Sequence, residues 1–442
     1  MTTAALTSRI AHELAGIAGE TFVCQDPAEL EKLSVDNAPP GIAVSPGSAE
    51  EVAEVLRLAN REGLVVVPAG GGTQQGIGRP PQKIDIMLRT SRLDDIGHYD
   101  PGDLTIGVGA GTTVSSLRSL AADHRQLFPL DIARADIATI GGTMATAAHS
   151  AERQSYGAIR DFCIGVKFVT GDGKIAKGGG RVVKNVAGFD LMKLMIGSFG
   201  TLGVIVSASF KVFPAPALTR TFVGVFDNHE GAIAFREAVL QSPLSPLCLE
   251  LVSPKAQVHL GENAVSGRWS VLVRAGGSER VHARYRNELG SRIARELEGA
   301  EEARTWRAVA EFPTSVARQD GVSVVLNVSL TTHSIGEMLV AAQRAAEKNG
   351  LVVAVIGRVG VGSMLVAFLS PSAADCSSFA NAITDFRDQL PRDASAFVLH
   401  CPTNFKSKLD VWGTSPTDIA AMRIVKNALD PNGILNRGRF LF

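Results

Sequence analysis

The stretch Leu64–Arg79 (LVVVPAGGGTQQGIGR) joins a short apolar run to an unusually dense set of glycines. Its first four residues are apolar and mostly β-branched, which predicts a buried strand. The glycines from Gly70 to Gly72 have no Cβ, so the backbone there can take positive φ and approach a ligand closely. Successive N–H groups in such a loop can converge on an anion, and Thr73 and Gln75 can add hydrogen bonds. The loop therefore suits a diphosphate; the alternative is a turn that only reverses the chain.

Two common nucleotide-binding motifs are missing from this loop. The mononucleotide pattern GxxxxGK[ST] occurs nowhere in the chain, and the dinucleotide pattern GxGxxG is not found at the loop. The nearby segment Gly107–Thr113 (GVGAGTT) supplies only alternate glycines. A glycine-rich diphosphate loop outside both motifs indicates a different nucleotide-binding fold.

Length and composition exclude several classes of protein. A chain of 442 residues is long enough for about two to three domains. Its 44 basic and 44 acidic residues cancel, so no electrostatic signal for nucleic acid is present. The five cysteines form no CxxC pair, which argues against a zinc or iron–sulfur site within the chain and fits a reducing cytoplasm. We expect no signal peptide, and no membrane span because no run of about 18 apolar residues exists.

The order of the patterns predicts four parts. Residues 1–40 are an N-terminal helical segment, 41–215 a ligand-binding domain, 216–400 an α+β domain, and 401–442 a C-terminal segment. Ser48–Gly63 is predicted as a helix with Ser48 as its N-cap, so the glycine loop lies at the carboxyl end of a strand in a βαβ-like unit. The prolines of Val212–Pro216 mark the boundary between the two domains.

Residues 217–400 alternate strand patterns with amphipathic helices. This predicts a largely antiparallel sheet covered by helices on one face. One of the predicted helices spans Arg280–Gly299, and Ile419–Leu429 is predicted as a helix of the C-terminal segment. The predicted strands are Thr221–Phe226, Ser270–Arg274, Val322–Leu330, Val352–Arg358 and Ser363–Leu369.

A second candidate ligand contact is Ala138–Arg160 (ATIGGTMATAAHSAERQSYGAIR). Gly141 and Gly142 open a run of small residues, which would let the backbone pack against a bulky planar group. The alternative is a close-packed helix of small residues.

Together these stretches resemble the FAD-binding domain of the PCMH-type flavoproteins, the vanillyl-alcohol-oxidase superfamily, over about residues 40 to 215. Gly179–Ile205 (GGRVVKNVAGFDLMKLMIGSFGTLGVI) and Ala428–Phe440 (ALDPNGILNRGRF) more specifically resemble the FAD-binding second subunit of bacterial glycolate oxidase. The resemblance implies an α+β fold, in which a two-subdomain PCMH-type FAD-binding domain is followed by an α+β cap domain with a largely antiparallel sheet.

The resemblance also assigns cofactor contacts by position. The glycine loop would hold the FAD diphosphate, the small-residue segment the ribityl chain and flavin, and the two later stretches the adenine and the flavin edge. Some relatives carry a flavin-linking His in the loop; Ala69–Thr73 has none, so non-covalent FAD is expected. Phe199 replaces a carboxylate of related sequences, and Arg437 replaces a proline. The expected cofactor-binding residues are Pro68, Ala69, Gly70, Gly71, Gly72, Thr73, Gln74, Gln75, Ala138, Thr139, Gly141, Gly142, Tyr156, Gly157, Gly203, Val204, Ile205 and Asn436.

The catalytic residues of related 2-hydroxy-acid oxidising enzymes have no counterpart in this chain. Those relatives carry a stretch resembling GHAGDGNLH, and the best match is Gly357–Leu365 (GRVGVGSML). Arg358, Val361 and Leu365 stand where His, Asp and His would be. Oxidation of a 2-hydroxy acid needs a base and a cationic or metal anchor, and neither Val361 nor Leu365 supplies one.

A few polar residues stay open as candidates. Arg358 could clamp a carboxylate bidentately. His149 is the only histidine inside the predicted flavin-facing segment, and His400 comes just before Cys401-Pro402; each is otherwise a packed or solvated side chain. Lys184 and Asn185 could contact the cofactor or cap the next helix.

The resemblance therefore implies an FAD-binding subunit of a glycolate-oxidase-type complex. A catalytic flavoprotein partner would oxidise a small 2-hydroxy acid, and an iron–sulfur partner would carry electrons onward. The alternative is a free-standing FAD-dependent 2-hydroxy acid dehydrogenase or oxidase. We expect no metal site, no nucleic-acid partner and a cytoplasmic location, with any contact to the inner face of the membrane made through partners.

Overall fold

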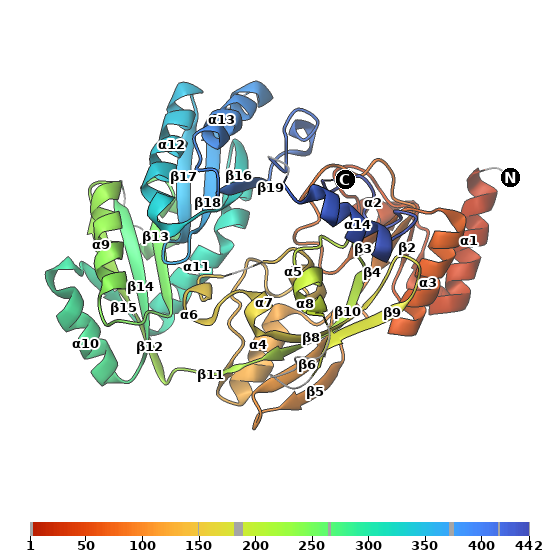
Figure 1. Cartoon of the computed structure of the whole chain (residues 1–442), viewed down its shortest axis with the longest axis horizontal. Coiled ribbons are helices and arrows are strands. Elements are labelled where there is room, and N and C mark those ends of the chain that lie inside the picture. The colour runs from red at the N-terminus through yellow and green to blue at the C-terminus, as the bar shows by residue number, and fades with distance from the viewer. Residues whose placement is uncertain are drawn as a thin grey trace.

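The computed structural model describes residues 3–148, 150–180, 189–263, 267–370, 375–413 and 416–441. Two lobes lie side by side, and Figure 1 shows the C-terminal helix, in dark blue, lying across the lobe that contains the N-terminus. We call the part before residue 216 the amino-terminal region and residues 216–413 the central region.

The amino-terminal region begins with a four-stranded sheet in the order β1-β2-β4-β3. The strands β2, β4 and β3 are parallel to one another, and the helix α3 packs on the sheet through Val52, Leu56 and other buried apolar residues. Ser48 Oγ accepts a hydrogen bond from Glu51 N at 3.1 Å and Gly63 ends the helix at φ 68°, so the predicted helix is confirmed. The elements are α1 (Thr3–Ala18), β1 (Val23–Cys24), α2 (Pro27–Lys32), β2 (Ile42–Val44), α3 (Ala49–Glu62), β3 (Val66–Ala69) and β4 (Ile86–Arg89).

A second, antiparallel sheet of five strands follows in the order β5-β6-β10-β8-β9. Phe128, Phe162 and Phe210 pack edge-on or tilted in the core between this sheet and its helices. The elements are β5 (Ile96–Asp100), β6 (Thr105–Gly109), α4 (Val114–Asp123), β7 (Gln126–Leu127), α5 (Ile140–Ala145), α6 (Arg153–Tyr156), α7 (Ile159–Phe162), β8 (Cys163–Val169), β9 (Ile175–Gly179), α8 (Leu191–Met195), β10 (Val204–Lys211) and β11 (Phe213–Pro214).

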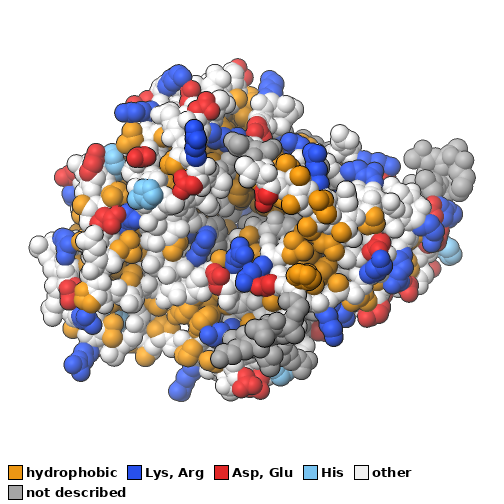
Figure 2. All heavy atoms as spheres, in the orientation of Figure 1, with side chains coloured by type: hydrophobic (Ala, Val, Ile, Leu, Met, Phe, Trp, Pro, Cys, Tyr) orange, Lys and Arg blue, Asp and Glu red, His pale blue; other side chains and the backbone are white. Residues whose placement is uncertain are grey.

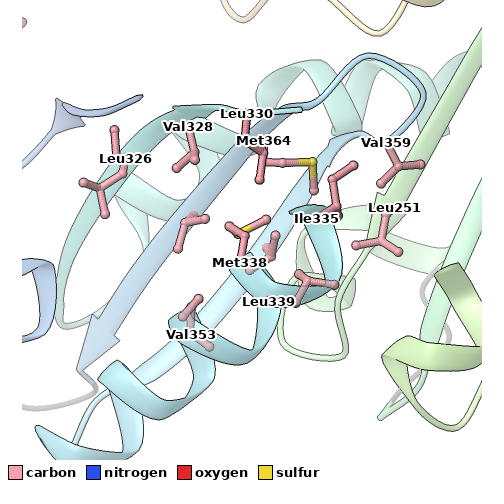
Figure 3. Close-up of a cluster of buried hydrophobic side chains, with 14 of the residues drawn as sticks. Leu251, Leu326, Val328, Leu330, Ile335, Met338, Leu339, Val353, Val359 and Met364 are labelled. Carbon is pink, nitrogen blue, oxygen red and sulfur yellow. The ribbon is translucent and has the colours of Figure 1, made fainter. Parts of the chain in front are cut away.

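The central region is built on one antiparallel sheet of eight strands, in the order β15-β12-β14-β13-β17-β18-β16-β19. Figure 3 shows Met338 and Leu339 of α12 packed on Leu326, Val353 and other residues of one face. The elements are β12 (Leu218–Phe226), α9 (His229–Gln241), β13 (Cys248–Val252), β14 (Trp269–Gly277), α10 (Glu279–Leu289), β15 (Arg295–Leu297), α11 (Gly299–Arg318), β16 (Val322–Ser329), α12 (Ile335–Lys348), β17 (Val352–Arg358), β18 (Ser363–Ser370), α13 (Cys376–Asp388) and β19 (Ser395–His400).

Two expectations for this region need correction. Helices cover both faces of the sheet, because α11 buries Trp306 and Phe312 against the face opposite α12. The helix expected over Arg280–Gly299 ends at Leu289, and Arg295–Leu297 is instead an edge strand paired with β12. The predicted strands are all present, with β13 and β19 in addition.

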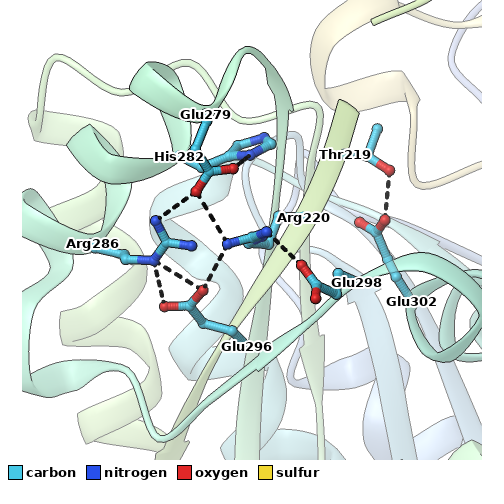
Figure 4. A network of polar contacts seen from close by, with 8 residues as sticks. All are labelled: Thr219, Arg220, Glu279, His282, Arg286, Glu296, Glu298 and Glu302. Carbon is cyan, nitrogen blue, oxygen red and sulfur yellow. Dashed lines mark hydrogen bonds and ion pairs between the residues drawn. The ribbon is translucent and has the colours of Figure 1, made fainter. Parts of the chain in front are cut away.

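Polar contacts fix the start of α11 beside the edge of the central sheet that β15 and β12 form. Figure 4 shows Arg220 among the carboxylates of Glu279, Glu296 and Glu298. These pairs are partly exposed and contribute little individually. Glu302 is buried, and its carboxylate accepts hydrogen bonds from the hydroxyls of Thr219 and Thr221.

The C-terminal segment returns to the amino-terminal region, as α14 (Ile419–Leu429) and the turns that follow. Val66 N donates to Ile434 O at 2.9 Å, and Asn436 N donates to Val66 O at 3.0 Å. The buried carboxylate of Asp430 accepts from Ile434 N and Leu435 N, which holds the turn in place.

The visible surface mixes both signs of charge, as Figure 2 shows, in keeping with the zero net charge. Among the described residues, no helix is both long and apolar enough to cross a membrane.

Candidate cofactor site

A deep hollow of about 870 Å³, counted out to its mouth, opens at the carboxyl end of β3. It is bounded by the glycine loop, the start of α5, the turn before β10 and the C-terminal segment. All of the expected cofactor-binding residues line it except Ala138, Tyr156 and Gly157. The fold thus brings four stretches that are far apart in the sequence around one cavity, which we call the cofactor cavity.

The glycine loop forms one wall of the cavity, and its backbone packs tightly against the segment from Ile137 to Thr139. A Cβ at Gly70 would lie 1.9 Å from Thr139 Oγ1, and one at Gly71 would lie 1.6 Å from Ile137 O. Gly72 has φ +72°. The backbone N–H groups from Gly70 to Gln75 donate to no other described residue. Such unpaired donors along a cavity wall suit a diphosphate.

The opposite wall is the start of α5. Thr139 is its N-cap, with Oγ1 3.4 Å from the Gly142 N–H. A Cβ at Gly141 would lie 2.8 Å from the Ala110 methyl group, so only glycine lets α5 approach β6 this closely. Ala138 is buried behind this wall, and Val114 N donates to its carbonyl.

Tyr156 and Gly157 lie apart from the cavity. The Tyr156 ring packs against Phe213, with 4.8 Å between ring centroids, and burial raises the pKa of its hydroxyl. His400 ends β19 opposite Val325, and burial lowers its pKa. His149, Lys184 and Asn185 lie outside the described residues.

Asn436 and Phe199 close the cavity together. Asn436 Nδ2 donates to Phe199 O at 2.7 Å, and both residues have positive φ. The Phe199 ring stacks on Phe440, with centroids 5.4 Å apart, and meets Trp412 edge-on at 5.0 Å. The residue that replaces a carboxylate of related sequences therefore builds an aromatic wall.

Arg439 is the main lining residue that the sequence patterns missed. It is buried, and its guanidinium donates to the carbonyls of Gln75, Ile77 and Arg79. Trp412 Nε1 donates to Arg439 O at 2.9 Å. The C-terminal segment thus holds the glycine loop in shape. Arg439 lies three residues after Asn436 in the same C-terminal motif, and this proximity could have indicated in the sequence that Arg439 lines the cavity.

Known sequence families cover most of the chain. One described as FAD binding domain matches residues 40–179, and one described as FAD linked oxidases, C-terminal domain, matches residues 215–390 and 412–440. The chain belongs to the FAD-linked oxidases. It has the PCMH-type fold and is an FAD-dependent oxidoreductase, and the unpaired N–H groups of the glycine loop fit the cofactor that the family binds.

Two relatives show the range of this similarity. D-2-hydroxyglutarate dehydrogenase of Xanthomonas citri pv. viticola is 26% identical, over 94% of this chain and 93% of the relative. Glycolate oxidase subunit GlcE of Escherichia coli is 30% identical, over 54% of this chain and 68% of the relative. The structure of p-cresol methylhydroxylase with substrate bound superposes with a TM-score of 0.76 at 18% identity, over 99% of this chain and 97% of the other, which shows the shared fold.

This FAD-linked oxidase has a second, much smaller pocket between its two regions; it measures about 260 Å³ counted out to its mouth, but only about 10 Å³ of it admits the centre of a water molecule. Asp131 and Glu152 line it from the amino-terminal region, and Arg274, Cys248 and Arg358 from the central sheet. Arg274 Nε lies 3.2 Å from the buried carboxylate of Glu302. We call it the interdomain pocket.

Glu250 lies next to Arg358 on the neighbouring strand of the oxidase, in direct register. Its carboxylate is fully buried, and neither oxygen accepts a hydrogen bond from a described residue. Arg358 Nε lies 3.8 Å from Glu250 Oε1. Burial raises the pKa of Glu250 to about 7, and the charge of Arg358 acts in the opposite direction.

This pKa makes the stability of the oxidase depend on pH. A carboxyl group whose pKa is higher in the folded state stabilises the fold at low pH and loses that contribution as pH rises through about 7. Glu250→Gln should remove the dependence, so the unfolding free energy of the variant relative to wild type should rise by up to about 3 kcal/mol between pH 4.5 and 7.5.

Urea unfolding at the two pH values measures this difference. Glu54→Gln, on the exposed side of α3, is the control and should follow the wild type. A Glu250→Gln variant whose pH dependence equals that of wild type would contradict the prediction.

Proposed function

We propose that this chain is the FAD-binding subunit of a glycolate-oxidase-type complex, with the residues that line the cofactor cavity as its FAD contacts. Bound FAD supplies two-electron redox chemistry. In this proposal a catalytic flavoprotein partner oxidises a small 2-hydroxy acid, an iron–sulfur partner accepts the electrons, and the FAD of this chain is non-covalent. The complex works in the cytoplasm, where any membrane contact is made by the partners.

The observation that carries the proposal is that an apolar residue of the β17–β18 hairpin stands where related enzymes have a catalytic histidine. Leu365, at a position where the resemblance expects His, is 3% exposed and packs with Ile356 and Ala367 under α11. An apolar side chain in an apolar cluster can neither accept a substrate proton nor bind a metal. The similarity to glycolate oxidase subunit GlcE supports the same assignment.

A second candidate is a free-standing FAD-dependent 2-hydroxy acid dehydrogenase. The similarity to D-2-hydroxyglutarate dehydrogenase along nearly the whole of both chains favours it. So does Arg358, because it presents a cation to the interdomain pocket.

A visible spectrum of the purified chain, recorded anaerobically before and after glycolate or D-lactate is added, tests both functions. We expect a flavin band that stays oxidised until the two partner subunits are added. Prompt bleaching by the acid alone would establish the free-standing enzyme instead. A chain without a flavin band, even after incubation with FAD, would contradict both.

A further inference from the structure

The outer face of α14 is apolar although it is exposed. Ile424 is 71% exposed, and Ala420, Ala421 and Ala428 are exposed on the same side of the helix. Residues three and four positions apart are neighbours on a helix surface, so these side chains form one patch. Figure 2 shows hydrophobic side chains gathered on the visible surface around α14. We call this patch the α14 face.

The inner face of α14 is apolar as well. Val425 and Leu429 pack against the core between the five-stranded sheet and its helices. Lys426 also turns inward, where its Nζ pairs with Asp430 and donates to Thr201 O at 2.7 Å. A helix that is apolar on both faces is normally buried on both. The sequence of α14 therefore suits a helix whose outer face is covered by another protein.

The cations beside the α14 face have no carboxylate partner within the described part of the chain. Arg423 is exposed and makes no ion pair there. Arg437 donates to two backbone carbonyls, and it lies near the last turn of α14, since its charge adds to the effect of burial in lowering the pKa of Lys426. Asp418, before the first turn, is the exposed acidic residue next to the helix. The surroundings of the face thus favour a partner that brings carboxylates.

The α14 helix lies directly against the cofactor cavity. Thr201, which accepts the hydrogen bond from Lys426, lines that cavity, and so does Asn436 in the turns that follow the helix. A helix with its side chains is about 10–12 Å across, so a protein on the α14 face would sit about one helix diameter from the cavity wall. Electron transfer slows steeply with distance. In a redox complex, the protein that accepts the electrons therefore needs such a close approach.

We propose that the α14 face docks the electron-accepting protein partner, through an apolar segment of that partner whose carboxylates pair with Arg423 and Arg437. Ile424 is the central anchor, and the alanines on either side of it let the partner's backbone approach closely. That this partner is the iron–sulfur subunit rests on the proposed function. The new element is the surface that receives it.

Sedimentation velocity of the FAD-loaded full chain, mixed with the purified iron–sulfur subunit, tests the surface. Ile424→Glu should weaken the complex about thirtyfold or more, because it places a carboxylate at the apolar centre of the contact. Ile424→Leu keeps the apolar contact and should bind as wild type does. Val258→Glu is the matched control, because Val258 is 72% exposed but lies in the central region, and it should also bind as wild type does.

The charge of Arg423 gives a second, independent measurement. Arg423→Glu should weaken the complex about tenfold at low salt and much less at high salt, because salt screens exposed charges. Arg304→Glu, on the exposed side of α11, is the control and should bind as wild type does. All of these residues are exposed, so the FAD content and thermal unfolding of each free variant should match those of wild type.

The outcomes distinguish this inference from the proposed function. An Ile424→Glu variant that binds the iron–sulfur subunit as tightly as wild type overturns the inference and leaves the FAD-binding subunit intact. A loss confined to the catalytic flavoprotein partner, or to self-association of this chain, also overturns it, because another protein would then cover the α14 face. A wild type that holds FAD but binds neither partner subunit overturns the proposed function, and the inference with it.

Discussion

Gly71→Ala should lower the FAD content of the purified protein to less than a tenth of wild type. The new methyl group would lie 1.6 Å from Ile137 O and 2.6 Å from its carbonyl carbon, which are backbone atoms of the opposite wall. The loop must therefore move away from that wall, and overpacking of this kind costs about 1–3 kcal/mol of unfolding free energy. Flavin absorbance per protein and thermal unfolding measure the two effects.

Gly76→Ala is the matched control in the same loop. A methyl group there meets only Lys406 Nζ, at 3.9 Å, and Gly76 does not have positive φ. This variant should keep its FAD and unfold at the wild-type temperature. Equal FAD contents in the two variants would show that the close contact at Gly71 does not shape the cofactor cavity.

Lys406→Met should destabilise the fold by about 3–5 kcal/mol. Lys406 Nζ lies 2.6 and 2.7 Å from the two carboxylate oxygens of Asp36 and donates to Gly76 O as well. Both side chains are almost completely buried, at 2% and 5% exposed. Removal of the lysine leaves a buried, uncompensated carboxylate beside the glycine loop, so weaker FAD binding should accompany the loss of stability.

The double variant Asp36→Asn with Lys406→Met tests whether the cost comes from the unpaired charge. It should be more stable than Lys406→Met alone, because no buried charge remains unpaired. Denaturant unfolding of the wild type, both single variants and the double variant gives the coupling energy. Additive effects of the two substitutions would contradict the buried pair.

Secondary structure was predictable where local signals agreed. Ser48 and Gly63 bound α3 because a side-chain cap and a left-handed glycine act within one turn of the chain. The prediction of a single helix from Arg280 to Gly299 was wrong at its C-terminal end. The strand β15 there is defined by its pairing with β12, and no local sequence pattern contains that contact. The long helix α11 includes Pro313, a residue that normally predicts a break.

The candidate site likewise has a part that the sequence could predict and a part that it could not. Its glycine-rich stretches are contiguous, so their residue types are visible in the sequence. The aromatic wall of Phe199, Trp412 and Phe440 joins three distant segments, and only the folded chain brings them together. The approach of Glu152 to Arg358 likewise depends on how the two regions pack.

The contact between the C-terminal segment and the glycine loop has a consequence for biosynthesis. Arg439 and Arg79, which hold each other by hydrogen bonds, are 360 positions apart. A ribosome therefore makes the entire central region before this wall of the cavity exists, and we expect the chain to acquire its FAD only after that. Residues 40–179, although they match the FAD binding domain, lack Asn436 and Arg439. We therefore expect a chain stalled or cleaved before these residues to stay colourless, so that yellow colour would report that synthesis has passed this point.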